Sequence, residues 1–273
     1  MRLGRALAIL GCGLAFLGGL FAFQHPFHEY PAVEYNDFPL PPDYAEKTEW
    51  VFARLMFPGG PLDGYRGRFD GDFRQGFTLW TQDYPRADRH FVQALRRLSR
   101  IHARSVEQAV LLEDHDSYDF PWLYAVQAGE WGLTQEEANL LREHLLRGGF
   151  FFADDIHGTE ERAEFERRVH FAFPDRPIVE IANDDPIFHT VFDLNDRFVI
   201  PGWEHLREGS KKGGTVGHWL AVYDDKGRVM VVANINQDTG DSWEWADSPA
   251  YPEKFSGLGI RMGVNYVIYA MTH

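Results

Sequence analysis

The segment of residues 148–158, GGFFFADDIHG, constrains the fold more than any other stretch of the chain. Two glycines are followed by three phenylalanines and an alanine at positions 150–153. Neighbouring residues of a strand point to opposite faces of a sheet, so a strand that is apolar at every position is buried on both faces. Such strands are typical of parallel sheets that helices cover on both sides. The segment therefore predicts a central strand of an α/β domain.

Helical and extended patterns alternate along the rest of the chain. Further strands are expected at residues 50–57, 110–112, 120–126 and 178–181, and a hairpin from strands at 219–223 and 229–233. Helices are expected from Asp83 to about His102, from the capping box at 134–137 to Gly148, from about Thr159, and from Pro252 to Met271. This alternation predicts an α/β fold with a mainly parallel sheet and a late antiparallel hairpin.

Charge and cysteine content exclude several classes of function. The chain has 273 residues, of which 44% are hydrophobic, and a formal net charge of -14. Such an acidic protein is a poor partner for nucleic acid or for an anionic membrane surface. The single cysteine, Cys12, lies in an apolar N-terminal stretch. A disulfide within the chain and a cysteine nucleophile in the folded domain are therefore both excluded.

The N-terminal segment indicates export. Arg2 and Arg5 precede a long stretch without any charge. A basic start before an apolar run is typical of a secretory signal, and this run is also just long enough for a short membrane helix. We therefore expect a signal peptide or a transmembrane anchor in residues 1–24, a linker or irregular approach in residues 25–48, and one domain in residues 49–273. Such a segment places the domain on the periplasmic side of the inner membrane, anchored or secreted.

Asp154, Asp155 and His157 follow the predicted central strand and are candidate catalytic residues. In open α/β sheets, ligands bind beyond the carboxyl ends of the strands. Two neighbouring carboxylates in a partly dry crevice repel each other, so one of them can be held protonated as a general acid. With His157 they can also bind a divalent cation. The alternative is that one aspartate solvates the strand end and the other caps the next helix.

Two further stretches supply candidate binding residues. Asp83 and Tyr84 stand at a predicted helix start, where Asp83 can serve as N-cap or face the same crevice. Residues 234–247 follow a strand and combine carboxylates, amides and indoles. This mixture suits a sugar or peptide ligand, but it also suits a loop packed by its own tryptophans. The candidates from this loop are Asn236, Asp241, Trp243 and Glu244.

Residues 120–158 read as a strand, a capped helix, a buried strand and the ending His157-Gly158. This succession resembles the core of the class I glutamine amidotransferase-like superfamily. The resemblance implies a three-layer, flavodoxin-like fold with its site after the second of these strands. The reactive cysteine of that superfamily would fall at Ile156 or Asp155. Because the nucleophile is missing, the resemblance does not carry amidotransferase activity to this chain.

A closer resemblance rests on five short strings. They are WxxDYP from Trp80, GGFFFADDIHG from Gly148, FPDRP from Phe173, PIFH from Pro186 and DxWEW from Asp241. Together they resemble one uncharacterised bacterial family, catalogued as domain of unknown function 4159. The resemblance implies the amidotransferase-like fold and an exported or membrane-associated protein. It implies no established reaction.

Two functions stay open at this point. The leading hypothesis is a non-catalytic module at the cell envelope that binds a small molecule, a sugar or a protein partner, with the membrane contacted only through the N-terminal segment. Such a module needs an exposed patch, which we expect at Trp243 and Trp245. No motif requires a cofactor, although a divalent metal is compatible with the acidic clusters.

The alternative is a hydrolase that acts through carboxylates, with or without a metal, on an envelope sugar or peptide. In that case Asp155 is the base or ligand, Asp154 and His157 are its partners, and Asp83 and Glu244 form the opposing wall. An enzyme of this kind needs the side chains to converge on one reacting atom.

Overall fold

The structure is a computed structural model that describes residues 26–64 and 71–273. The signal peptide or anchor expected in residues 1–24 lies outside these ranges. Within them, no helix is both long enough and apolar enough to span a membrane. Residues 26–48 contain neither helix nor strand and contact the domain, since the Tyr30 amide donates to the Tyr84 hydroxyl at 3.1 Å.

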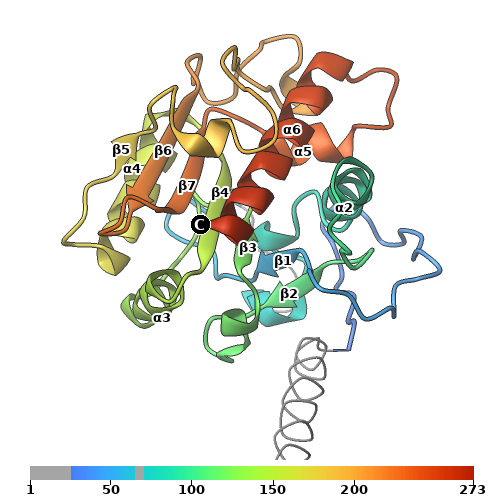
Figure 1. Ribbon diagram of the computed structural model, residues 1–273, viewed down its shortest axis with the longest axis horizontal. Helices are drawn as coiled ribbons and strands as arrows, with labels where there is room; N and C mark the ends of the chain where they lie inside the picture. The colour runs from blue at the N-terminus through green and yellow to red at the C-terminus, as the bar shows by residue number, and fades with distance from the viewer. Residues whose placement is uncertain (1–25, 65–70) are drawn as a thin grey trace, which may run out of the picture.

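Seven strands form one mixed sheet in the order β2-β1-β3-β4-β7-β6-β5 (Figure 1). The strands are β1 (Ala53–Leu55), β2 (Gln108–Val110), β3 (Trp122–Ala125), β4 (Phe150–Ile156), β5 (Val179–Glu180), β6 (His218–Tyr223) and β7 (Val229–Ile235). The first five strands in the sheet order run parallel, and β6 runs antiparallel to β7 and β5. Their order matches the 2-1-3-4-5 order of flavodoxin-like sheets. The predicted α/β class, mainly parallel sheet and late hairpin are confirmed.

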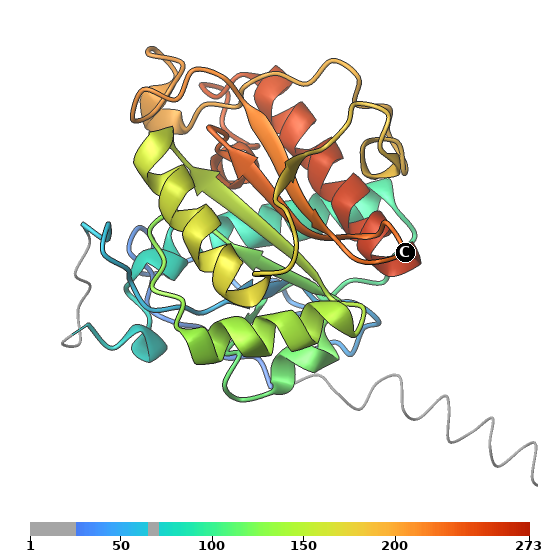
Figure 2. The ribbon, with the colours of Figure 1, turned by 90° about the vertical axis from the view of Figure 1, so that its left-hand side faces the viewer.

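Helices cover both faces of the sheet, which gives three layers (Figure 2). One face carries α3 (Gln135–Leu146) and α4 (Gly158–Ala172), and the other carries α2 (Arg86–Leu98), α5 (Thr239–Glu244) and α6 (Glu253–Thr272). Short 3₁₀ helices lie in the loops at Phe73–Gln75, Leu79–Thr81, Asp116–Asp119, Pro186–Phe188 and Trp203–His205. The apolar side chains of the strands therefore divide between two cores, one on each face.

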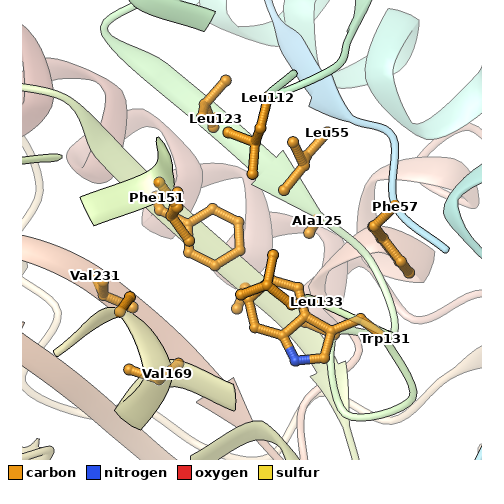
Figure 3. Packing of buried hydrophobic residues seen from close by; sticks show 14 of the residues in the cluster. Leu55, Phe57, Leu112, Leu123, Ala125, Trp131, Leu133, Phe151, Val169 and Val231 are labelled. Atoms are coloured by element: carbon orange, nitrogen blue, oxygen red, sulfur yellow. The ribbon is translucent and has the colours of Figure 1, made fainter. Parts of the chain in front are cut away.

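Strand β4 lies at the centre of the sheet, and all seven of its residues are buried. Phe151 pairs in register with Leu123 of β3 and with Val231 of β7. Its ring stacks on Trp131, with 5.6 Å between the ring centroids (Figure 3). Phe150 and Phe152 belong to the core on the opposite face. The central strand predicted from the phenylalanine run is thus confirmed.

A buried ion pair joins the sheet to α2. Arg54 of β1 is fully buried and binds both carboxylate oxygens of Asp88 on α2, at 2.8 and 2.5 Å. The same guanidinium donates to the carbonyl oxygens of Trp80 and Gln82, at 2.9 and 3.1 Å. It also lies over the ring of Tyr124. Arg54 therefore fixes the backbone that leads into Asp83.

The start and the end predicted for the helix at Asp83 to about His102 are wrong. α2 begins at Arg86, its N-cap is Pro85, and no side chain caps it, so Asp83 does not serve as the predicted N-cap. The helix ends at Leu98, because the hydroxyl of Ser99 accepts the next free amide, from Ile101, and itself donates to the Leu95 carbonyl. Leu98, the last residue of the helix, is 47% exposed.

Strand boundaries differ from the predicted ones as well. β1 is shorter than expected, β2 begins two residues earlier, and β5 has only two residues, both exposed at the edge of the sheet. β4 continues through Asp154 and Asp155, so these acids lie inside the strand and not after it. The expected loop of residues 234–247 contains a helix, α5. The capping box of α3 is confirmed, with Thr134 and Glu137 bonding to each other's backbone amides.

The buried pair generates a stability prediction. We expect Asp88→Asn to lower the free energy of unfolding by about 3–5 kcal/mol, because it leaves the Arg54 charge buried without a counter-charge. The partly exposed pair of Arg96 and Asp43 supplies the matched control, and Asp43→Asn should cost less than about 1 kcal/mol. Urea unfolding of the three proteins measures both values. An equal, small effect of the two substitutions would contradict the role assigned to Arg54.

Candidate ligand-binding site

One cavity of ≈ 290 Å³ lies at the carboxyl ends of β3, β4 and β7. Its lining side chains come from segments far apart in the sequence. They are Glu34, Gln82, Asp83, Gln127, Asp155, Trp203, Glu204, His205, Lys211, Asp238, Asp241, Glu244 and Trp245. Seven of these residues are carboxylic acids and one is a lysine. The position agrees with the general rule for ligand sites in open α/β sheets.

Asp155 reaches the cavity because β4 carries a bulge at its end. Between Ala153 and Ile156 the register against β7 shifts, and Asp155 adopts a left-handed backbone with φ 54. Its carboxylate contacts the Lys211 amine at 3.0 and 3.2 Å and His157 Nε2 at 2.6 Å. Burial alone would raise the pKa of Asp155, but Lys211 and His157 outweigh it and hold the pKa below its usual value. Both oxygens of Asp155 therefore have partners, and these partners favour its charged form.

Asp154, its neighbour, is completely buried beneath the cavity. It accepts from the Gly240 amide at 2.8 Å and from the Tyr124 hydroxyl at 3.4 Å. Burial raises the pKa of Asp154 to about 7, with the charge of Asp155 adding to the shift. Of the two predicted aspartates, Asp155 lines the cavity and Asp154 joins β4 to the start of α5.

Asp238 and Asp241 stand one turn apart around the start of α5. Asp238 is the N-cap, and its Oδ1 accepts from the Asp241 amide at 3.1 Å. Asp241 Oδ2 accepts from the Trp203 amide at 2.5 Å. A Cβ atom on Gly202 would stand 2.4 Å from Asp238 Oδ2 and 2.9 Å from Asp241 Oδ2, so a larger residue there would displace these carboxylates. Burial and the surrounding carboxylates raise the pKa of Asp238 well above its usual value.

Asp83 faces α5 from the opposite wall. It is 3% exposed, its backbone is left-handed with φ 59, and its amide donates to Glu34 at 3.1 Å. Its Oδ2 has no hydrogen-bond partner among the described residues. Burial, followed by the charges of Asp241 and Glu244, raises the pKa of Asp83 well above its usual value.

Glu244 and the segment before the domain form the mouth of the cavity. The Tyr35 hydroxyl donates to Glu244 and accepts from Arg86 at 2.9 Å. Burial, followed by the hydrogen bond and charge of Asp241, raises the pKa of Glu244 to about 9. Glu34, which is exposed, accepts from the Gln82 side chain at the same place. Residues of the irregular approach thus complete a cavity formed by the domain.

The tryptophans do not form the expected exposed patch. Trp243 is fully buried and stacks on Phe91, so it belongs to the core beneath α5. Trp245 lines the cavity, but one neighbour of its ring is Trp203, stacked at 4.5 Å, and another is the Arg86 guanidinium at 4.5 Å. Trp245 is therefore a fixed wall with its ring already in contact, and not an open platform for a sugar.

Two other predicted binding residues have structural contacts. Tyr84 is fully buried, and its hydroxyl accepts from the Tyr30 amide. Asn236 accepts from the Gly158 amide at 2.9 Å and donates to the Val216 carbonyl at 2.7 Å, which links the end of β7 to the start of α4. The cavity thus brings together Asp83, Asp155, Asp241 and Glu244, while Tyr84, Asn236 and Trp243 do not line it.

The cavity residues that sequence reasoning missed include the charged side chains of Glu34, Lys211 and Asp238. Glu34 and Lys211 come from irregular segments, where no periodic pattern predicts which side chains turn inward. Asp238 could have been predicted from the sequence, because Asp238 and Asp241 are spaced like the N-cap and the third residue of a helix. That pattern predicts two carboxylates on one side of a helix start.

Three overlapping groups of side chains in this region could each hold a metal ion. They are Asp155, His157 and Asp238; Asp83, Asp238 and Asp241; and Glu34, Asp83 and Glu244. Within each group the ligand atoms lie within 4.8 Å of one another. Chemically, the cavity can bind a cation, or it can exchange protons through carboxyl groups of unequal acidity.

Residues 74–271 match the family model described as Domain of unknown function (DUF4159). The match covers well over half of the chain, and the chain therefore belongs to this family. It includes Asp83, Asp155, Asp238 and Asp241 but not Glu34. No curated protein is significantly similar to the chain.

The two adjacent aspartates should respond differently to the same substitution. We expect Asp155→Asn to lower the free energy of unfolding by about 2 kcal/mol, because Lys211 loses its counter-charge in a largely buried place. Asp154→Asn should cost less than about 1 kcal/mol, since an amide oxygen can still accept from Gly240 and Tyr124. Chemical denaturation at neutral pH measures both. A larger loss for Asp154→Asn than for Asp155→Asn would contradict the charges assigned to the pair.

Proposed function

We propose that this member of the DUF4159 family is a binding module whose cavity takes a small, positively charged ligand. The observation that carries the proposal is the excess of acids: seven carboxylic acids and one lysine line ≈ 290 Å³, and the lysine is already paired with Asp155. Carboxylates that crowd together in a largely buried place repel one another. A cationic ligand relieves that repulsion and gains affinity from it.

The geometry favours binding over hydrolysis at Asp155. A general base or a nucleophile needs a carboxylate oxygen free to reach the substrate. Both oxygens of Asp155 are engaged by Lys211, and one also by His157. The tryptophan wall presents no free ring on which a sugar could stack. Charge is therefore the property by which this cavity would select its ligand.

We also propose that the domain works on the outer side of the cytoplasmic membrane and that it is related to the class I glutamine amidotransferase-like superfamily. The basic and apolar N-terminal segment supports the first point. The flavodoxin-like strand order supports the second. So does the left-handed backbone of Asp155 near the end of β4, close to the place where that superfamily has a sharp turn with its cysteine.

A matched pair of ligands tests the charge preference. In the presence of EDTA, we expect glucosamine to raise the melting temperature of the full-length protein by a few degrees, because its amine enters the acidic cavity. N-acetylglucosamine, which has the same ring without the charge, should have no effect. Differential scanning fluorimetry at neutral pH measures both shifts.

The variant Glu244→Gln should weaken the glucosamine shift, because it removes one cavity acid. Glu208→Gln, which changes an exposed acid of the loop that carries Trp203 and Lys211, is the matched control and should keep the shift. Equal stabilisation by the two sugars would show that the cavity recognises the sugar ring and not the charge. No stabilisation by glucosamine or by any inorganic cation would contradict the proposed function.

A further inference from the structure

The group of Asp83, Asp238 and Asp241 shares one residue with each of the other two groups, so we call it the middle group. It has the geometry of a cation site. One carboxylate oxygen from each of Asp83, Asp238 and Asp241 lies within 4.8 Å of the other two. A Ca²⁺ ion binds oxygen at about 2.3–2.6 Å, so oxygens separated by up to about twice that distance can share one ion. Two of the three residues belong to the start of α5, and the third comes from the segment that Arg54 holds.

Asp83 supplies an observation that does not depend on this spacing. Its side chain is buried, its Oδ2 has no hydrogen-bond partner among the described residues, and it lines the cavity. Buried polar atoms are nearly always paired, and an orphaned carboxylate oxygen in a native fold calls for a missing partner. A cation in the cavity would be that partner.

Two glycines keep the space around these oxygens open. A Cβ atom on Gly240 would stand 2.4 Å from Asp83 Oδ2, and one on Gly202 would stand 2.4 Å from Asp238 Oδ2 and 2.9 Å from Asp241 Oδ2. Neither glycine has a positive φ, so backbone conformation does not require glycine at either place. What requires it is the close approach of the backbone to the same three carboxylates.

The two neighbouring groups are weaker candidates. In the group of Asp155, His157 and Asp238, the Lys211 amine already occupies the side of Asp155 that an ion would take. In the group at the mouth, both oxygens of Glu34 accept hydrogen bonds and Glu244 accepts from Tyr35. The orphaned oxygen of Asp83 is shared by the mouth group and the middle group, but in the middle group it meets two carboxylates from the same helix start, Asp238 and Asp241.

We propose that Asp83, Asp238 and Asp241 bind a hard divalent cation such as Ca²⁺, Mg²⁺ or Mn²⁺. Carboxylate oxygens are the donors that these ions prefer, and three of them leave coordination positions for water or for hydroxyl groups of a second ligand. This inference rests on the proposed function, since it names an inorganic cation as the charged species held in the same cavity.

Thermal melting of the full-length protein after removal of metal by EDTA and dialysis tests the site. We expect Ca²⁺, Mg²⁺ or Mn²⁺ at saturating concentration to raise the melting temperature by about 5 °C or more. Asp83→Asn should lose that shift, and without metal it should melt at or above the wild-type temperature, because it removes a crowded charge. Gly240→Ala should weaken the shift without changing any charge.

Two controls separate the outcomes. Glu208→Gln should keep the full metal shift, because this acid is exposed and does not line the cavity. Asp241→Asn should also lose the metal shift. Because two different variants are compared, misfolding of one of them cannot by itself account for the loss. If glucosamine stabilises the protein and none of the three metals does, the proposed function stands and the metal site is overturned. A metal shift that survives in both Asp83→Asn and Asp241→Asn also overturns it.

Discussion

The buried guanidinium of Arg54 is the interaction on which the site depends. It joins β1 to α2 through Asp88 and holds the carbonyl oxygens of Trp80 and Gln82. The next residue after Gln82 is Asp83, so the position of the orphaned carboxylate follows from that of the guanidinium. Because a buried charge without its partner is costly, Arg54 and Asp88 keep this part of the chain in one arrangement. The backbone that leads into Asp83 at the cavity wall is therefore held rigidly.

In the cavity, by contrast, acidic side chains far outnumber basic ones. Arg54 has a full set of partners. The cavity instead places four acids opposite one another: Asp83, Asp238, Asp241 and Glu244. Lys211 lines the cavity with them, but its amine is paired with Asp155. Such crowding lowers stability, and it is typical of sites where stability is given up for binding. In our proposal Asp83 takes the ligand role that the sequence suggested for Asp155. Asp155 stabilises Lys211 and the bulge at the end of β4.

Local pattern predicted the frame of the molecule. The phenylalanine run predicted β4, and the capping box predicted α3, because burial on both faces and reciprocal capping depend on residues close in sequence. The opposing wall of Asp83 and Glu244 was also predicted, from the rule that parallel strands end at one edge. These predictions need no knowledge of distant contacts.

Long-range packing decided the rest. Trp243 was expected in an exposed patch or, alternatively, in a loop packed by its own tryptophans, but the six-residue helix α5 packs it onto Phe91. The bulge that directs Asp155 into the cavity depends on the register between β4 and β7, which no short sequence window contains. Glu34 lies in the irregular approach, before residues 74–271 that match the family model. The mouth of the cavity therefore includes a residue outside the matched region.

The measurement that tests the central claim most directly is anomalous diffraction from crystals of the protein grown with Mn²⁺. The account predicts an anomalous peak in the cavity, coordinated by oxygens of Asp83, Asp238 and Asp241. A second crystal of Asp83→Asn, grown under the same conditions, should show no peak there. Wild-type crystals without a peak, in which Asp83 Oδ2 bonds only to ordered water, would contradict the claim that this cavity holds a cation.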